Sequence, residues 1–216
     1  MAASSRNARP SLLAAARSRR RPGAAGLRLA TAAALTLLVL AACSPPPAPP
    51  GDFEPIASRF DADTEGWTSA EDQAPTWQAP GYLSVVDDDI GWQYAIAPAR
   101  FHGDWTGAET LSFRVLVDDG LIEHPLRVMI SGPDHALYVA FPLDDLVSGE
   151  WVAFSVPLKA GRWLHFDGED VLEGPVATPS ELAATLAAVQ DLRIRLDLTE
   201  KFSGDEVNGV DDVVVE

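Results

Sequence analysis

The stretch "LSFRVLV", residues 111–117, alternates apolar side chains with other side chains at a period of two. Its first, third, fifth and seventh residues are apolar, and Ser112, Arg114 and Leu116 stand between them. Successive side chains of a β-strand point to opposite faces of the sheet. The stretch is therefore predicted to be a half-buried strand, with Phe113 facing a core and Arg114 facing outward.

Similar alternation recurs on both sides of this stretch. Further strands are predicted at residues 82–86, 92–97, 126–130, 137–141, 152–158 and 192–198. Between them lie clusters such as "DDG" at 118–120 and "SGPD" at 131–134, which are typical of turns. One short helix is indicated by "TPSE" at 178–181, which has a capping threonine, a proline at the first helical position and a capping-box glutamate. Many short strands with one helix predict an all-β sandwich of two antiparallel sheets.

The first 43 residues have the layout of an export signal. They contain seven arginines and no acidic residue, and from Leu29 to Ala42 only Thr31 and Thr36 are polar. This apolar run is too short to span a bilayer comfortably, and small residues follow it. The sequence thus predicts a signal at residues 1–43, a linker at 44–51 and one domain at 52–216.

The only cysteine, Cys43, ends the segment "LAAC" at 40–43. This segment resembles the lipobox of bacterial lipoproteins, in which the cysteine is diacylated on sulfur and becomes the first residue of the mature chain. The resemblance implies a lipid anchor at Cys43 and a place in the bacterial cell envelope, on the outer membrane if the organism has one. An N-terminal membrane anchor with an incidental cysteine is the alternative. The proline-rich linker would hold the domain off the membrane.

Charge separates at the same cysteine. All 32 acidic residues lie after Cys43, together with nine of the 16 basic residues, so the part after the signal has a net charge of −23. Such a domain repels nucleic acid and anionic membrane surfaces. It suits a neutral glycan, a cation-bridged partner or metal ions, and solubility alone is the simpler interpretation of most of these charges.

Three segments, taken together, resemble the laminin B (domain IV) module and the wider galactose-binding-like jelly-roll group. They are "RFDADTEGW" at 59–67, "GYLSVVDDDIGWQYAIAPARFHGDWTGAETLSFRV" at 81–115, and "ATPSELAATLAAVQDLRIRLDL" at 177–198 with "NGVDDVVVE" at 208–216. The resemblance implies a jelly-roll β-sandwich without catalysis, used in adhesion or glycan recognition. It does not identify the ligand, because one sandwich hosts many functions.

Acids in the first and last of these segments suggest a calcium site. Two valines further along the last strand share the face of Asp211, so if they point inward, the carboxylate does too. A buried carboxylate is costly unless it is paired or bound to a metal. The resemblance implies that the first and last strands run side by side, which would bring Asp61 and Asp63 to Asp211 as oxygen ligands for a structural Ca²⁺. The alternative is that these acids cap backbone N–H groups or pair with Arg59.

The predicted outward strand positions carry arginines and aromatic rings. They hold Arg114, Arg127, Arg193, Arg195, Tyr138 and Trp151. If these strands are neighbours, one sheet presents flat rings for stacking of sugars beside arginine forks that hold carboxylates or hydroxyls. Trp163, in "AGRWLHFD" at 160–167, is the best candidate on a loop. The alternative is that the arginines form salt bridges with Asp197 and other acids, under cover of the helix.

The sequence has no recognisable signature of an enzyme. Its four histidines have no metal-ligand spacing, its serines in turns lack a nucleophile-elbow sequence, and it has no phosphate loop. We therefore expect a non-catalytic, surface-anchored module that binds a glycan or a matrix-like ligand. A structural envelope lipoprotein whose partner is a protein is the second hypothesis, and a small glycan hydrolase is a distant third.

Overall fold

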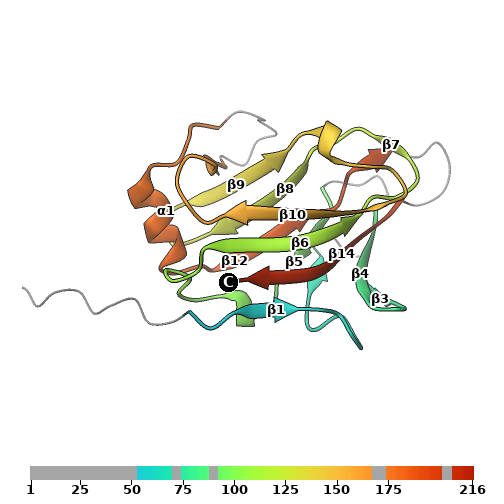
Figure 1. Cartoon of the computed structure of the whole chain (residues 1–216), viewed down its shortest axis with the longest axis horizontal. Helices are drawn as coiled ribbons and strands as arrows, with labels where there is room; N and C mark the ends of the chain where they lie inside the picture. Colours follow the sequence, from blue (N-terminus) through green and yellow to red (C-terminus); the bar gives the residue numbers. More distant parts are fainter. Residues whose placement is uncertain (1–52, 70–73, 88–91, 167–173, 201–205) are drawn as a thin grey trace, which may run out of the picture. The chain divides into compact units, whose positions relative to one another are not determined.

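The computed structural model describes residues 53–69, 74–87, 92–166, 174–200 and 206–216, and shows two facing antiparallel sheets (Figure 1). Sheet A has the order β10 (Trp151–Pro157), β6 (Thr110–Leu116), β14 (Glu206–Val215), β4 (Tyr82–Asp87) and β3 (Thr76–Gln78), and β1 (Ile56–Ser58) also pairs with β14. Sheet B has the order β11 (Leu164–His165), β9 (Ala136–Phe141), β8 (Leu126–Ser131), β12 (Asp191–Arg195), β5 (Tyr94–Ile96) and β2 (Thr68–Ser69). A separate two-stranded ribbon joins β7 (Leu121–Ile122) to β13 (Thr199–Glu200). The predicted all-β sandwich is confirmed.

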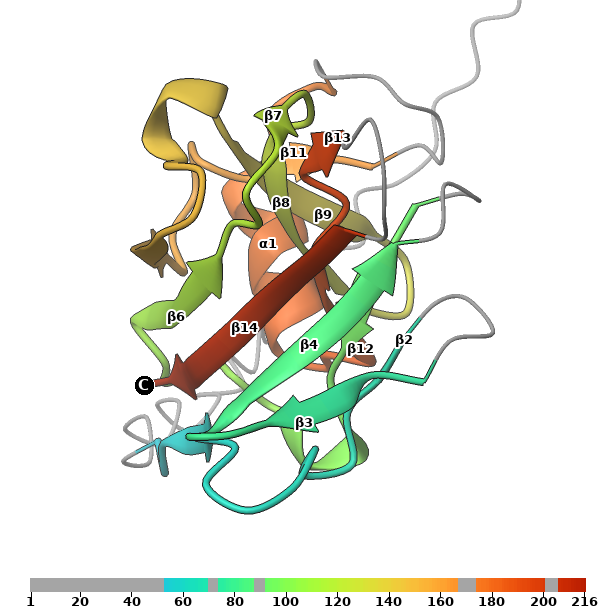
Figure 2. The same cartoon turned by 90° about the vertical axis from the view of Figure 1, so that its right-hand side faces the viewer.

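Strand β14 lies at the centre of sheet A and organises it. It pairs with β6 on one side, and on the other side with β4 along its first half and β1 along its second half (Figure 2). The first and last strands therefore run side by side, as the family resemblance implied. Between Asp211 and Val214 the register with β6 shifts, because β14 contains a bulge there.

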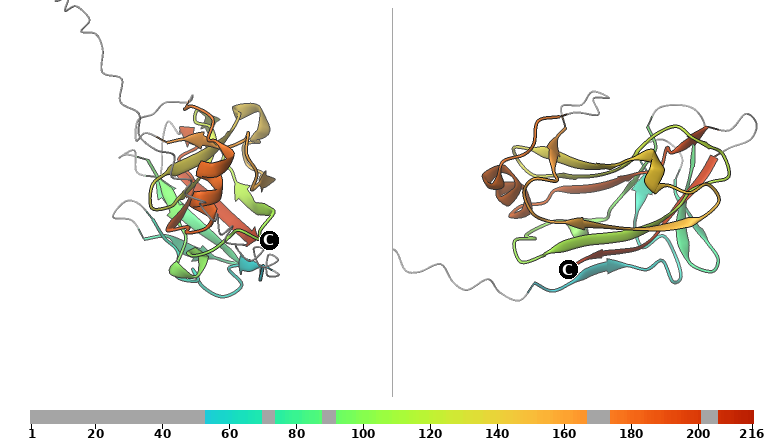
Figure 3. Two further views of the ribbon diagram at one scale, coloured as in Figure 1. Left: turned by 90° about the vertical axis from the view of Figure 1, so that its left-hand side faces the viewer. Right: turned by 45° about the horizontal axis from the view of Figure 1, so that its top comes forward.

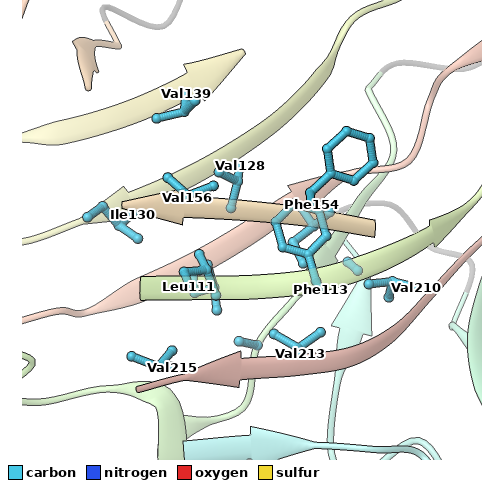
Figure 4. Close-up of a cluster of buried hydrophobic side chains, with 14 of the residues drawn as sticks. Leu111, Phe113, Val128, Ile130, Val139, Phe154, Val156, Val210, Val213 and Val215 are labelled. Atoms are coloured by element: carbon cyan, nitrogen blue, oxygen red, sulfur yellow. The ribbon is translucent and has the colours of Figure 1, made fainter. Parts of the chain in front are cut away.

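The two sheets enclose one apolar core. Phe113 of β6 stacks on Phe154 of β10 with ring centroids 5.6 Å apart, and Phe141 of β9 in the opposite sheet lies 4.6 Å from Phe154. Ile194 of β12 is fully buried in the same cluster. Figure 4 shows Val128 of β8, which is also fully buried, with Phe113 and Phe154. The predicted common interior of the period-two strands is thus confirmed, since residues of both sheets meet in it.

The predicted helix is α1 (Pro179–Leu186), at one end of the sandwich (Figure 3). Thr178 caps it as expected: its hydroxyl accepts from the Glu181 N–H at 3.3 Å, and its own N–H donates to Glu181 Oε2 at 2.7 Å. The pKa of Glu181 is lowered to about 2, mainly by the hydrogen bonds from Thr178 and to a smaller extent by His165, whose Nε2 is 3.2 Å from Glu181 Oε2. Because α1 lies at the end of the sandwich, it does not form the cover over the strand arginines that the sequence allowed.

Residues Pro46–Glu216 form one compact unit. Its core cluster lies within the described ranges, so this segment has a core of its own and is suited to fold independently. The predicted signal, Cys43 and the linker fall at residues 1–52, outside the described residues. In the ranges that are described, no helix has the length and apolar character needed to cross a bilayer.

Candidate functional site

The predicted site residues lie on two different sheets. Trp151 belongs to β10 of sheet A, whereas Tyr138 lies on β9, Arg127 on β8, and Arg193 and Arg195 on β12, all in sheet B. The expectation of one platform is therefore wrong. The reason is that the chain crosses from sheet B to sheet A between β9 and β10 (Figure 1). Trp151 and the arginines of sheet B therefore belong to opposite layers of the sandwich.

On sheet B, the outward side chains line up across the strands. Met129 is opposite Tyr138 on one side and opposite Arg193 on the other, and Arg193 is in turn opposite Ile96 of β5. Arg195 is opposite Tyr94. We call this set the arginine face: Tyr94, Arg127, Met129, Tyr138, Arg193 and Arg195.

Much of the arginine face is covered. Tyr138 is 1% exposed, because the chain after β10 returns over sheet B and forms β11 beside β9. The ring of Phe166 lies 6.2 Å from the Tyr138 ring, and the Gly174 N–H donates to the Tyr138 hydroxyl at 3.3 Å. Arg127 is 4% exposed and its guanidinium lies 5.6 Å from the centre of the Tyr138 ring. The outward direction of these two side chains is as predicted, but their expected exposure is wrong.

Arg195 is the most enclosed charge of this face. It is 1% exposed, donates to Asp197 Oδ2 at 3.1 Å, and its guanidinium carbon is 3.4 Å from the centre of the Trp92 ring. A buried guanidinium is tolerated only when it is paired and hydrogen-bonded. Arg195 and Asp197 therefore fix Trp92, whose ring also meets His124 edge-on at 5.2 Å.

Trp92 is a functional candidate that the sequence interpretation missed. Trp67 and Trp105, which lie in the laminin-B-like segments of the sequence as Trp92 does, are buried. Trp92 is only half-buried and lies at the outer surface, next to Tyr94 and His124, which are also half-buried. In the predicted strand at 92–97, Trp92 stands two residues before Tyr94, so the alternation places both side chains on the same face.

Arg193 is the more open arginine of β12. Its side chain is 37% exposed, and its Nε lies 2.5 Å from Asp191 Oδ2. The alternative interpretation, in which arginines pair with acids including Asp197, thus describes both Arg193 and Arg195. What this face offers to a ligand is a fixed indole, a half-buried histidine and tyrosine, and a guanidinium with part of its surface in solvent.

Trp163 was expected on an exposed loop, and that expectation is wrong. The side chain is fully buried in the core cluster, and its indole N–H donates to the Pro157 carbonyl at 3.1 Å. The Ala177 N–H donates to the Trp163 carbonyl, so the segments before β11 and before α1 hold this residue between them. No ring face is left for a ligand.

The predicted inward direction of Asp211 is also wrong. The bulge in β14 resets the alternation, so Val213 and Val215 point into the core while Asp211 points outward opposite Arg114. Its carboxylate pairs with Arg114, not with Arg59, and accepts from the Asp212 N–H at 2.7 Å. Burial raises the pKa of Asp211. Asp63 caps the Glu65 N–H at 2.6 Å, which matches the capping alternative.

Calcium binding by Asp61, Asp63 and Asp211 has no support from this arrangement. Across the ranges described above, no three His, Cys, Asp or Glu side chains are grouped so that they could hold a metal ion. The calcium site stays a prediction.

Comparison with solved structures identifies the fold. The L4b domain of human laminin α-2 superposes with a TM-score of 0.58 and 12% sequence identity, over 74% of this chain and 96% of that chain. This chain has the laminin-B-like fold. The predicted family resemblance is confirmed at the level of the jelly-roll sandwich.

Less similar structures also match the laminin-B-like domain. One is from a study of promiscuous carbohydrate-binding modules of the β-sandwich superfamily, with a TM-score of 0.40 and 13% identity over 78% of this chain and 58% of that chain. Another is the K3 adhesin domain of Lys-gingipain from Porphyromonas gingivalis, with a TM-score of 0.41 and 16% identity over 74% of this chain and 97% of that chain. No protein-family model matches the sequence, and no curated protein matches it.

Proposed function

We propose that the laminin-B-like domain is a non-catalytic module that binds a glycan at the Trp92 end of the arginine face. The observation that carries this proposal is the stack of Trp92 on Arg195, with 3.4 Å between the guanidinium carbon and the ring centre. The buried pair of Arg195 and Asp197 holds the indole in place before a ligand arrives. A fixed aromatic ring loses little conformational freedom on binding, so more of the contact energy becomes affinity.

The surroundings of Trp92 suit a sugar ring. The C–H face of a pyranose packs on an aromatic ring, and hydroxyl groups around it need hydrogen-bond donors and acceptors. His124 meets the indole at its edge, and the Tyr94 side chain follows two residues later on the same side of the chain. Arg193 supplies a partly exposed guanidinium opposite Ile96 of the same strand.

Trp92→Ala is expected to weaken binding to the glycan at least about tenfold, because tenfold corresponds to about 1.4 kcal/mol and an aromatic contact supplies about that much. Residues 46–216 would be screened on a glycan array, and the affinity for each positive glycan measured by titration calorimetry. The matched control is Trp77→Ala on β3, because Trp77 is another tryptophan with part of its surface in solvent but lies in sheet A. Unchanged affinity of the Trp92→Ala protein for every glycan bound by the wild type would contradict the proposal.

A protein partner in the envelope is the second candidate. It is favoured by the ion pairs of Arg193 with Asp191 and of Arg114 with Asp211, which occupy guanidiniums that a glycan would otherwise use. An array without any positive glycan would favour this candidate.

We also propose that the domain is displayed on the bacterial envelope by lipid at Cys43, on the outer membrane where one exists. The support is the basic and apolar leader, the "LAAC" segment and the proline-rich linker. Cys43→Ser is expected to move the protein out of the membrane fraction, and mass spectrometry of the wild type should find an acylated peptide beginning at Cys43. An uncut, unacylated N-terminus would contradict the anchor.

A further inference from the structure

A second cluster of aromatic and charged side chains lies on the outer face of sheet A, on the opposite side of the sandwich from Trp92. Trp151 begins β10 and is 37% exposed, in contrast to the buried Trp67, Trp105 and Trp163. The ring of Tyr82, from β4, lies 5.3 Å from the Trp151 ring, and the two planes make an angle of 82°. The two rings therefore form a corner in which each ring borders the other at a right angle.

The absence of a side chain at Gly209 leaves the space in which this corner forms. Gly209 belongs to β14, which lies between β6 and β4. It is opposite Leu116 of β6 on one side and Ser84 of β4 on the other. Leu116 is in turn opposite Trp151 of β10. A Cβ on Gly209 would come within 2.9 Å of Cδ2 of Tyr82. The Tyr82 ring occupies the space that a side chain on β14 would fill, and so reaches across the strand to Trp151. Glycine inside a strand weakens the strand and commonly marks such a close approach.

Charges line one side of the corner. The guanidinium carbon of Arg114 lies 5.2 Å from the centre of the Trp151 ring, and Arg114 pairs with both Asp211 and Asp212, the latter at 3.0 Å. The bulge in β14 places these two carboxylates next to each other, and the Asp212 backbone has a positive φ of 49°. One guanidinium faces two carboxylates, so the corner has no positive charge left over. It can exchange hydrogen bonds with hydroxyl groups, but it repels anions.

We propose that the corner of Tyr82, Trp151, Arg114, Asp211 and Asp212 is a second binding site, for an uncharged pyranose ring of a neutral glycan. The ring packs its C–H face on the aromatic pair, and its hydroxyls bind the carboxylates and the guanidinium. Acidic sugars and phosphates are excluded by the second carboxylate and by the net charge of −23 carried after Cys43. A purely apolar ligand would bury the partly exposed ion pair of Arg114 and Asp212 without giving it new hydrogen bonds.

The proposal goes beyond the Trp92 site, because the two sites lie on opposite faces. Facing sheets are about 10 Å apart, and the side chains on each outer face add to this separation. A single straight glycan chain therefore cannot occupy both sites of one molecule. One domain with both sites would therefore bind two separate glycan chains. A surface that carries many copies of the domain would bind a glycan network with higher avidity.

The test uses residues 46–216 and affinity electrophoresis in gels containing one of three probes: hydroxyethyl cellulose, galactomannan or polygalacturonate. The first two polymers are neutral and the third is anionic. We expect a neutral polymer to retard the wild type, Trp151→Ala to weaken that retardation at least about tenfold in apparent Kd, and polygalacturonate to have no effect on either protein. Gly209→Ala should also weaken it, because the new methyl group displaces the Tyr82 ring.

The controls separate this site from the Trp92 site. Trp77→Ala removes a tryptophan of sheet A that lies outside the corner. The neutral polymer should retard this variant as strongly as the wild type. A melting curve for each variant shows whether it is folded. Weaker retardation of Trp151→Ala in the Trp92→Ala background supports the corner even if the Trp92 site fails. Equal retardation of Trp151→Ala and wild type by every neutral polymer, no retardation of the wild type by either neutral polymer, or retardation by polygalacturonate alone overturns it.

Discussion

Replacing Trp163 with alanine is expected to lower the free energy of unfolding by about 3–5 kcal/mol. The side chain is fully buried, and its removal deletes a large apolar surface and leaves a cavity between the β10–β11 segment and the start of α1. The indole N–H also donates to the Pro157 carbonyl, which would lose its partner. A domain of this size has a total stability of about 5–15 kcal/mol, so the variant should be close to unfolding at physiological temperature.

Urea denaturation of residues 46–216, followed by circular dichroism, measures this effect. The midpoint should fall while the slope stays the same, since the folded and unfolded states expose similar surfaces in both proteins. The matched control is Trp77→Ala, a tryptophan that is 36% exposed, for which we expect a smaller loss of about 1–2 kcal/mol, because part of its ring and its hydrogen bond to the Phe60 carbonyl are lost. A loss below about 1 kcal/mol in Trp163→Ala would mean that Trp163 lies in the exposed loop that the sequence first suggested.

Arg195→Met is expected to cost about 3–5 kcal/mol, because it leaves Asp197 as a buried carboxylate without the guanidinium beside it. Both side chains are largely excluded from water, with exposures of 1% and 11%. The substitution also removes the support beneath Trp92, so any glycan affinity that depends on the fixed indole should fall together with stability. Changing both residues, as Arg195→Met with Asp197→Leu, should recover much of the stability, since a buried ion pair can be replaced by apolar residues at little net cost.

A double-mutant cycle over Arg195 and Asp197, measured by urea denaturation, gives the interaction energy directly. Arg193→Met is the matched control on the same strand. Its ion pair with Asp191 is partly exposed, and such pairs contribute about 0–1 kcal/mol. If Arg193→Met and Arg195→Met were equally destabilising, burial of the Arg195 pair would not be the source of the effect.

Arg195 on sheet B and Arg114 on sheet A have different roles although both are arginines on outward strand positions. On sheet B, the Arg195 guanidinium is enclosed beneath Trp92 and acts as a support. On sheet A, the Arg114 side chain is 43% exposed beside Trp151, where it can contact a ligand directly. Arg114 and Arg195 both alternate with core residues in the sequence, so their different burial follows from what other segments place over each sheet.

Most of the secondary structure could be predicted from the sequence. The alternation around Phe113 indicated the strand and its buried face, because the period of two is a local property of an extended chain. The cap at Thr178 was predicted with its proline and Glu181, since all of its hydrogen bonds are made within one turn. The short strands β1, β2, β3, β7, β11 and β13 were not predicted, because two or three residues carry too little pattern of their own.

The site was predicted only in part. The outward direction of Arg127 and Tyr138 followed from the alternation, but their burial depends on the segment that returns as β11, which is distant in the sequence. The bulge that turns Asp211 outward could not be predicted from the alternation of apolar and polar residues. The one local hint of the Tyr82 corner was Gly209, a glycine inside a strand.

The sequence by itself determined that this chain forms half-buried strands with one capped helix, and that all of its acidic residues follow a basic and apolar segment ending in the only cysteine. Those features depend on side-chain spacing and composition, which act locally. Only the tertiary structure decided which strands share a sheet, which arginines are covered, and which aromatic rings stay open. These properties depend on contacts between segments far apart in the chain, and the period of two is the same in either sheet.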